Sequence, residues 1–474
     1  MANTKYKTQS LIKMPEKLTE LAEIFEENGH QLFAVGGFVR NSLLGISGGD
    51  IDICSDLDAK TVFEMLKDNE SFFTVQRDSD LGTIAIHDKK SKQYFEYTAF
   101  RQDNYSEGGK HRPEYVTLTN DMLLDAKRRD FTIGALYADA KNGFVYDPLN
   151  ALYDLDKVLI KTTSDDPFEI IKDDGLRILR MVRFACELGF YIDPLLYKQA
   201  KKHIGYLKDI AVERITEEFN KIILSDKKYL TIDKRISMPE HLRGMLILFD
   251  LGALEYIMPE LLEAKGTKQN KKFHAFDVLT HLFFVYKLMP PELELRLAGL
   301  LHDIGKPEAK KDHGDMKGHA KIGTEIAYIA LKRLKYKNSV IDRVCLLISE
   351  HMYDLRGNIE YEDLLEHLAR LGLNESEQLL ILKKADASGK GKEEMDEDII
   401  EKWERALNEL KKGYIPLSVN ELLISGEDIK QLGIYGKDIG FIKEKLFSYI
   451  IRHPKENKKD RLIELSKEFY YNKK

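Results

Sequence analysis

The sequence predicts an α+β protein in which a small mixed α/β domain comes first and all-helical segments follow. Strand and helix patterns alternate up to about residue 160, whereas strand patterns fade from residue 166 and helical periodicity carries the rest of the chain. The length of 474 residues suggests about three to four domains. A hydrophobic share of 43% is sufficient for ordinary buried cores.

Composition places the chain among proteins of the reducing cytoplasm, with no membrane partner. The segment MANTKYKTQSLIKMPEK lacks the apolar stretch of a signal peptide, and no apolar run approaches the ~18 residues of a membrane span. Three scattered cysteines, Cys54, Cys186 and Cys345, indicate neither a disulfide framework nor a zinc ribbon. The net charge of −6 does not exclude an RNA partner, because a local basic face attracts a phosphate backbone whatever the total charge.

The segment from residue 33 to residue 56 predicts a strand, a glycine turn, a short helix and a second strand. Gly36 and Gly37 allow the backbone to approach phosphates and to turn into a helix whose first N–H groups face anions. Since side chains alternate along a strand, Asp50 and Asp52 are expected on one face, where two carboxylates can share one Mg²⁺ or bridge two. An isolated acidic pair is more often solvated surface, but the glycine turn and a basic cluster downstream favour a chemical role.

Three further segments complete the predicted α/β domain. Residues 15–29 predict an amphipathic helix. The run YFEYTAFR, residues 94–101, alternates aromatic and polar side chains as a strand does, and Glu96 is its acidic member. The glycine-containing basic tract 107–113 predicts either a mobile loop near an RNA end or a plain hairpin linker. The candidate RNA contacts in and near this tract are Arg101, Lys110 and Arg112.

The next informative segment, DDGLRILRMVRFACELGF, predicts a helix with Asp173, Asp174, Arg177 and Arg180 on one side. One interpretation is an exposed helix with ordinary ion pairs, each worth about 0.3–0.5 kcal/mol. The other is base recognition, because a carboxylate accepts from an amino group and an arginine only donates. The Asp174–Arg177 pair then matches the edge of cytosine or adenine, which places an exocyclic amine beside an acceptor, and rejects uracil.

A third region carries histidines and aspartates with the spacing of a metal site. Residues His281, His302, Asp303 and Asp386 form an H…HD…D set that resembles the HD metal-dependent phosphohydrolases. His319 and His351 are expected to complete a second metal position. Imidazole and carboxylate ligands suit Mn²⁺, Ni²⁺, Fe²⁺ or Zn²⁺ better than Mg²⁺. The alternative is a domain that keeps the helices as a scaffold and hydrolyses nothing.

The ordered segments GGFVRNSLLG, GDIDI, FEYTAFR, RRDFTIGAL and DDGLRILRMVRF span roughly the first 190 residues. Their order resembles that of the bacterial class (class II) of CCA-adding enzymes and poly(A) polymerases. The resemblance implies that Asp50 and Asp52 are catalytic metal ligands and that Glu96 is the third carboxylate. The nucleotide-binding residues that follow from it are Gly36, Gly37, Arg40, Arg128, Arg129, Asp130, Asp173, Asp174, Arg177 and Arg180.

The resemblance also implies an architecture, namely a small mixed α/β nucleotidyltransferase head followed by an all-helical neck, an HD bundle and a C-terminal helical tail. The expected divisions are the head at 1–162, the nucleotide-recognising helix and neck at 163–225, a helical connector at 226–263, the HD domain at 264–392 and a tRNA-binding tail at 393–474. Three positions depart from the family pattern: Asn41, Gly134 and Asp173 stand where Asp, Asn and Glu are usual. None of these departures removes an expected metal ligand.

The implied activity is template-independent addition of CCA to tRNA 3′ ends from CTP and ATP, with release of pyrophosphate. Mg²⁺ in the head is the expected cofactor, and Mn²⁺, Ni²⁺ or another transition metal is expected in the HD domain. A poly(A) polymerase, or a specialist that adds only CC or only A, shares every motif quoted. A protein whose main activity is HD phosphohydrolysis is a further alternative, which intact Asp50, Asp52 and Glu96 disfavour.

Overall fold

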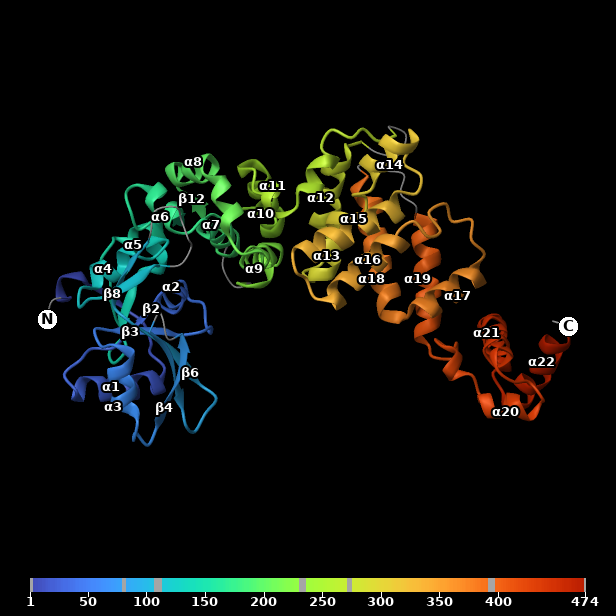
Figure 1. Ribbon diagram of the computed structural model, residues 1–474, viewed down its shortest axis with the longest axis horizontal. Coiled ribbons are helices and arrows are strands. Elements are labelled where there is room, and N and C mark those ends of the chain that lie inside the picture. The colour runs from blue at the N-terminus through green and yellow to red at the C-terminus, as the bar shows by residue number, and fades with distance from the viewer. Residues whose placement is uncertain are drawn as a thin grey trace. The chain divides into compact units, whose positions relative to one another are not determined.

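The computed structural model describes residues 3–78, 82–105, 113–229, 236–270, 275–390 and 397–472. The chain divides into two compact units, Met1–Met258 and Pro259–Lys474. The first unit holds the mixed sheet, and the described part of the second contains helices and no named strand (Figure 1). The predicted α+β class is confirmed. The division into five parts stays a prediction, and the border between the two units falls within the expected connector 226–263.

The first unit is built on an eight-stranded sheet with the order β1-β10-β9-β2-β3-β6-β5-β4. Its strands are β1 (Lys7–Leu11), β2 (Phe33–Val35), β3 (Asp52–Ser55), β4 (Phe72–Asp78), β5 (Thr83–Asp88), β6 (Tyr94–Ala99), β9 (Tyr137–Asp139) and β10 (Phe144–Tyr146). All neighbours in this sheet are antiparallel except β3 and β6, which run parallel. Two small pairs complete the strands: β7 (Arg101–Asn104) with β8 (Tyr115–Leu118), and β11 (Leu159–Ile160) with β12 (Tyr191–Ile192).

The helices of the first unit include the predicted amphipathic helix near the N-terminus, which begins after Pro15 and ends before a left-handed Gly29. They are α1 (Glu16–Glu27), α2 (Gly37–Leu43), α3 (Ala59–Leu66), α4 (Met122–Lys127), α5 (Ala151–Asp156), α6 (Pro167–Asp173), α7 (Leu176–Glu187), α8 (Pro194–Lys202), α9 (Val212–Ile223), α10 (Glu240–Leu251) and α11 (Leu254–Ile257). Strand β12 lies beyond residue 166, where the sequence predicts helices only. Its two residues pair in parallel with β11 after the chain turns at Gly189.

The two faces of the sheet differ along β4, β5 and β6. Side chains that alternate along these strands, including Phe72, Ile84 and Phe95, are buried. Helix α3 contacts β4 and β6, and the ring of Phe25 on α1 lies 6.0 Å from the ring of Tyr97 on β6. Helices therefore cover this face, and the opposite face carries exposed residues of the same strands.

The predicted helix through the DDGLR segment is interrupted, which corrects the sequence interpretation. Helix α6 ends at Asp173, Asp174 is extended with φ −150° and ψ 107°, and α7 begins at Leu176. A Cβ at Gly175 would lie 2.8 Å from the carbonyl oxygen of Tyr206, so this position must be glycine for the two segments to pack. The two aspartates and Arg177 therefore do not share one face of a continuous helix.

The second unit is a helical array. Its helices are α12 (Val278–Leu288), α13 (Leu293–Leu301), α14 (Lys306–His313), α15 (His319–Arg333), α16 (Asn338–Glu350), α17 (Tyr361–Leu371), α18 (Leu373–Gly389), α19 (Glu397–Lys411), α20 (Gly426–Gln431), α21 (Lys437–Arg452) and α22 (Lys459–Tyr471). Helices α12, α13, α16 and α18 contact one another around a core of buried leucines and alanines. In the part of the chain that the structure describes, no helix is long and apolar enough to cross a bilayer.

Candidate active site and metal centre

A glycine turn opens the candidate site of the first unit, as the sequence predicts. Strand β2 ends at Val35, Gly36 adopts φ 75°, and α2 begins at Gly37. A Cβ at Gly36 would lie 3.7 Å from Nη1 of Arg129 and 3.8 Å from Oδ2 of Asp52. The turn thus brings bare backbone close to both a guanidinium and a carboxylate.

The three expected catalytic carboxylates lie on or beside two neighbouring strands. Asp52 begins β3 and is in register with Glu96 on the parallel strand β6. Asp50 precedes β3, so the expectation that both aspartates belong to one strand is wrong. Among the described residues, these three carboxylates do not bring their oxygens within 4.8 Å of one another.

The pKa of Asp52 is raised by its place in this cluster. Although its side chain is exposed at the surface, desolvation of the carboxyl group, with the charges of Glu96 and Asp50, outweighs the nearby Arg129. Together they raise the pKa of Asp52 to about 6. Oxygen donors whose mutual repulsion favours a proton also favour a hard divalent cation, so the donor set fits such an ion.

A pocket of about 740 Å³ extends from these aspartates to helices α7 and α9. Nine cationic side chains line it: Arg40, Arg101, Arg128, Arg129, Arg177, Arg180, Arg183, Arg214 and Lys228. Its five carboxylates are Asp50, Asp52, Asp103, Asp130 and Asp174. The excess of cations suits a polyanion such as a triphosphate.

Arg128 and Arg129 are held by one buried carboxylate that the sequence analysis did not single out. Oδ1 of Asp125 on α4 accepts from Nε of Arg128 at 2.8 Å, and Oδ2 accepts from Nη2 of Arg129 at 3.2 Å and from the Tyr137 hydroxyl at 2.6 Å. Asp125 is fully buried. Burial opposes its ionisation, but the two guanidinium groups lower the pKa of Asp125 to about 2.

The two residues expected to recognise the base do not pair with each other. Oδ2 of Asp174 accepts from Nη2 of Arg214 at 2.8 Å, and its Oδ1 accepts from the backbone N–H of Leu176. The guanidinium of Arg177 donates to the carbonyl of Ile170 at 3.0 Å and of Arg128 at 3.1 Å, and lies 3.5 Å from Asp173. Asp174 and Arg177 nevertheless both line the pocket.

The remaining expected residues also have defined places. Nε of Arg180 donates to Oδ2 of Asp130 at 2.6 Å across the pocket wall. The buried guanidinium of Arg40 donates to Oδ1 of Asn41 at 2.8 Å and lies 3.3 Å from the Tyr229 hydroxyl.

The three candidate RNA contacts are placed less completely. Arg101 is buried in the pocket wall, with Nε 2.8 Å from Oδ1 of Asp103. Lys110 and Arg112 lie outside the described residues. Arg214 and Asp125 are the main residues that sequence reasoning missed, and an arginine at the start of the amphipathic helix 212–223 was the available signal for the first.

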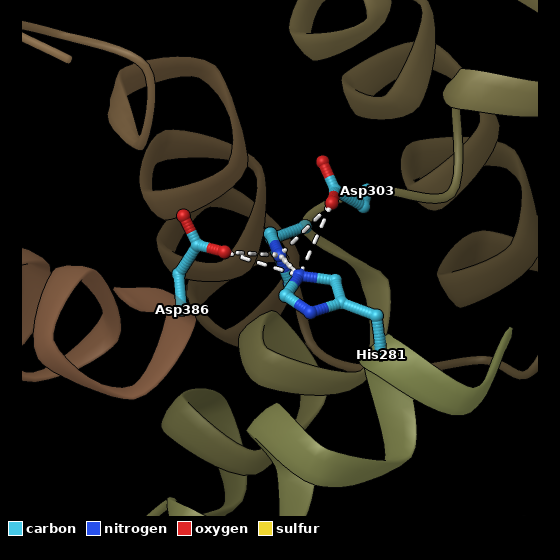
Figure 2. Close-up of side chains that lie close together, drawn as sticks. His281, Asp303 and Asp386 are labelled. Carbon is cyan, nitrogen blue, oxygen red and sulfur yellow. Dashed lines mark hydrogen bonds and ion pairs between the residues drawn. The ribbon is translucent and has the colours of Figure 1, made fainter. Parts of the chain in front are cut away.

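In the second unit, the predicted H…HD…D set gathers at one point (Figure 2). Nε2 of His281 on α12 lies 3.1 Å from Oδ1 of Asp386 on α18 and 3.3 Å from Oδ2 of Asp303. Nε2 of His302, at the end of α13, lies 3.2 Å from that of His281. The Nδ1 atoms of the two histidines face the carbonyls of Gly389 and Gly299 at 3.1 and 3.0 Å, which leaves Nε2 for a ligand.

The second predicted position shares Asp303 with the first. Oδ1 of Asp303 lies 3.1 Å from Nε2 of His319 and 3.6 Å from Nε2 of His351. Both of these histidines also turn Nδ1 to a backbone carbonyl, at 2.7 Å. Burial opposes the charge on His302, but Asp303 and Asp386 raise the pKa of His302 to about 10. The convergent nitrogen and oxygen donors fit one or two divalent metal ions.

Three family models match the chain in order. A model described as "Poly A polymerase head domain" matches residues 32–161, one described as "Probable RNA and SrmB- binding site of polymerase A" matches residues 189–234, and one described as "HD domain" matches residues 278–388. The first contains the glycine turn and the three carboxylates, and the last contains both metal-ligand groups.

Curated relatives include a CCA-adding enzyme of Limosilactobacillus fermentum, 37% identical over 202 residues, which are 42% of this chain and 47% of that protein. A CCA-adding enzyme of Lactococcus lactis is 31% identical over 53% of this chain and 58% of its own length. The chain thus matches about half the length of these two relatives. An A-adding tRNA nucleotidyltransferase of Deinococcus radiodurans is 27% identical over 76% of this chain and 78% of that protein.

Solved structures match the chain over nearly its full length. The Bacillus stearothermophilus CCA-adding enzyme in complex with CTP has a TM-score of 0.69 and 22% identity, and the match covers 97% of this chain and 98% of that one. The Thermotoga maritima CCA-adding enzyme complexed with tRNA has a TM-score of 0.61 and 17% identity, covering 97% and 100%. The ordered family models, the curated relatives and this shared fold agree with the glycine turn, the carboxylates and the HD cluster. The chain therefore carries, in order, the head-domain, RNA-binding and HD-domain matches, and it has the fold of the solved CCA-adding enzymes.

Proposed function

We propose that this chain adds C, C and A in turn to tRNA 3′ ends, using CTP and ATP and releasing pyrophosphate. The observation that carries the proposal is one pocket that joins the Gly36 turn, Asp52 and nine cations with Asp174 and Arg177. Such a pocket has places for a triphosphate, for a metal ion and for a base edge. The names of the relatives and of the solved structures support the same activity.

The triphosphate end of the pocket is assigned to the basic residues. The N–H groups after Gly36 and the guanidinium groups of Arg128 and Arg129 supply donors for phosphate oxygens. Mg²⁺ held by Asp50, Asp52 and Glu96 would supply Lewis-acid activation of the RNA 3′-hydroxyl and neutralise charge on the α-phosphate. Asp125 fixes the two guanidinium groups in place before the substrate arrives, which lowers the cost of ordering them.

The base end of the pocket is assigned to Asp174 and Arg177. Two backbone carbonyls anchor the Arg177 guanidinium, whose other contacts, to Asp173 and the Tyr105 hydroxyl, are long at 3.5 Å. Because arginine carries five N–H donors, this guanidinium can also donate to an acceptor on a base. Arg214 and the N–H of Leu176 orient the Asp174 carboxylate, a group that only accepts and so suits an exocyclic amine. Cytosine and adenine offer that combination and uracil does not.

The test is single-nucleotide analysis of products. A tRNA transcript lacking CCA is incubated with the full chain and each NTP in turn, then with CTP and ATP together. We expect two additions with CTP alone, three with both, and none with UTP. Long adenylate tails on unstructured RNA, without use of CTP, would replace the proposal with poly(A) polymerase activity.

A specialist that adds only the terminal A is a second candidate. The alignment to the Deinococcus radiodurans A-adding tRNA nucleotidyltransferase covers 78% of that protein, against 47% for the Limosilactobacillus fermentum enzyme. In the same assay, a specialist would leave a CCA-less transcript unchanged with CTP and extend only a transcript that ends in CC.

A hydrolytic activity in the second unit is a further candidate. Two donor groups that share Asp303, one with His281, His302 and Asp386 and one with His319 and His351, favour a transition-metal phosphohydrolase. Lys306 approaches the same carboxylate, with Nζ 2.5 Å from Oδ2 of Asp303. We propose Mn²⁺ or Ni²⁺ as the metal, tested by hydrolysis of a phosphomonoester and of a 2′,3′-cyclic nucleotide with each ion.

A further inference from the structure

The open face of the sheet carries a row of stacked rings next to the carboxylates. Phe73 on β4 pairs with His87 on β5, and His87 pairs with Tyr94 on β6. The ring centroids of Phe73 and His87 are 5.0 Å apart with planes at 16°, and those of His87 and Tyr94 are 5.4 Å apart at 26°. Phe73 is 42% exposed and Tyr94 is 36% exposed. We call these three residues the aromatic row.

The aromatic row lies on the same face as the catalytic carboxylates. Tyr94 and Glu96 are two residues apart on β6, so their side chains point the same way. Glu96 is in register with Asp52 on one side and with Ala85 on the other. Because strands stand about 4.8 Å apart, the row leads from the strand of Glu96 to the edge strand β4 over about 10 Å.

Positive charge borders the aromatic row. The turn between β5 and β6 presents Lys89, Lys90 and Lys92, all exposed. The guanidinium carbon of Arg77 lies 5.9 Å from the centroid of the Tyr94 ring. Rings that accept stacked bases, beside cations that accept phosphates, are the combination used by proteins that bind single-stranded nucleic acid.

We propose that the aromatic row and the lysine turn 89–92 bind the unpaired 3′-terminal nucleotides of the RNA that is being extended. The proposal rests on the proposed function, and it identifies the surface that holds the strand behind the reacting 3′-hydroxyl. Because His87 is stacked between the other two rings, bases stack on the outer faces of Phe73 and Tyr94, and the lysines contact the phosphates. A purely structural role, in which cross-strand ring pairs stabilise the hairpin, would give no preference for RNA with an unpaired end.

The test measures binding without catalysis. A fluorescent RNA hairpin with a three-nucleotide unpaired 3′ tail, and the same hairpin with a blunt end, are titrated with the full chain by anisotropy. The variant Phe73→Leu/Tyr94→Leu keeps apolar bulk and removes two rings. We expect it to bind the tailed RNA about tenfold more weakly and the blunt RNA equally well. Equal affinity of the variant and the parent for the tailed RNA would overturn the proposal.

The matched control is Tyr153→Leu. Tyr153 on α5 is 56% exposed and has the Lys157 ammonium 5.6 Å from its ring, but it belongs neither to the aromatic row nor to the pocket-lining residues. This variant should bind the tailed RNA as the parent does. For the phosphates, Lys90→Gln/Lys92→Gln should reduce the slope of log affinity against log salt by about 1.4, as expected for two single-strand contacts. An unchanged slope would remove the lysine turn from the proposal.

A cross-linking measurement covers the case in which the ring variant fails to fold. A tail that carries 4-thiouridine is irradiated with the parent chain, and the modified peptide is identified by mass spectrometry. Cross-links to Phe73, His87, Tyr94 or residues 89–92 support the proposal, and cross-links found only elsewhere overturn it. If the chain adds no nucleotide to any RNA but keeps its preference for the tail, the proposed function fails while this surface stands.

Discussion

The pocket of the head and the cluster of the HD region both present candidate metal ligands, but they differ in how close together these ligands lie. In the HD region, four residues bring one donor atom each within 4.8 Å, and backbone carbonyls fix the histidine rings. In the head, Asp50, Asp52 and Glu96 stay further apart, and the fixed groups are arginines held by Asp125. In the head, the groups already held in place are therefore those that suit an anionic substrate. In the HD region, they are those that suit a metal cation.

The difference follows from what each site exchanges. Under the proposed function, the head takes in a nucleotide and releases pyrophosphate in every cycle, and carboxylates that close around a metal only with the substrate suit that exchange. The imidazoles and carboxylates of the HD region are already held close together, so they would bind an ion with little rearrangement.

The largest expected effect is that of Asp52→Ala on nucleotide addition. Removing the carboxylate that is in register with Glu96 should lower the rate by more than about a thousandfold, since the removal of a key catalytic group costs on that order. Single-turnover addition to a CCA-less transcript measures the rate, and thermal unfolding should show an unchanged fold. Asp56→Ala, on an exposed aspartate just after the same strand, is the control and should keep full activity. Normal addition by folded Asp52→Ala would refute the assignment.

His302→Ala is expected to have the opposite effect, with loss of the HD-region functions and unchanged nucleotide addition. This variant should lose the tightly bound transition metal and any phosphohydrolase activity, while CCA addition stays at the parent rate. Elemental analysis of purified parent and variant measures the metal. His313→Ala removes an exposed histidine of the same unit and should keep the metal. Equal metal content in the parent and in His302→Ala would reduce the cluster to a scaffold.

Asp125→Asn tests whether the charge of Asp125 holds Arg128 and Arg129 in place in the absence of substrate. Because the folded pKa of Asp125 is about 2, below its usual value, this carboxylate stabilises the fold above about pH 4, and the contribution is lost as the pH falls towards 2. Breaking such a buried pair costs about 3–5 kcal/mol. Urea unfolding at pH 7 should show that loss, and the difference from the parent should shrink at pH 3. A constant difference across that range would show that the charge of Asp125 is not the cause.

Local features of the head could be predicted from sequence, and contacts between distant segments could not. The glycine turn depends on Gly36 and its neighbours, so its positive φ and the helix after it were predictable. The break at Gly175 arises because Tyr206, about thirty residues later, packs against it. The partner of Asp174 is likewise distant, since Arg214 comes from another helix.

The HD cluster was easier to predict because its residue types are rare together. Histidines on apolar helices rarely recur with an adjacent aspartate unless they share a ligand, and the structure confirms that these residues meet. Asp125 had no such signal. It lies in the ordinary helical sequence MLLDAK, and only the fold shows that two arginines converge on it.

The smallest expected effect is that of Arg177→Ala on the choice between CTP and UTP. The Arg177 guanidinium joins the carbonyls of Ile170 and Arg128, so Arg177→Ala removes both the proposed base contact and a hydrogen-bonded link between α6 and the end of α4. The ratio of CTP to UTP incorporation should fall about tenfold to a hundredfold, because the pocket no longer leaves a donor unpaired when uracil enters. Arg214→Ala should lower the ratio less, since it only orients Asp174. Competition assays with both nucleotides measure the ratio, and affinity for tRNA should not change in either variant. If the ratio stayed at the parent value in a folded Arg177→Ala protein, base selection would have to come from another wall of the pocket.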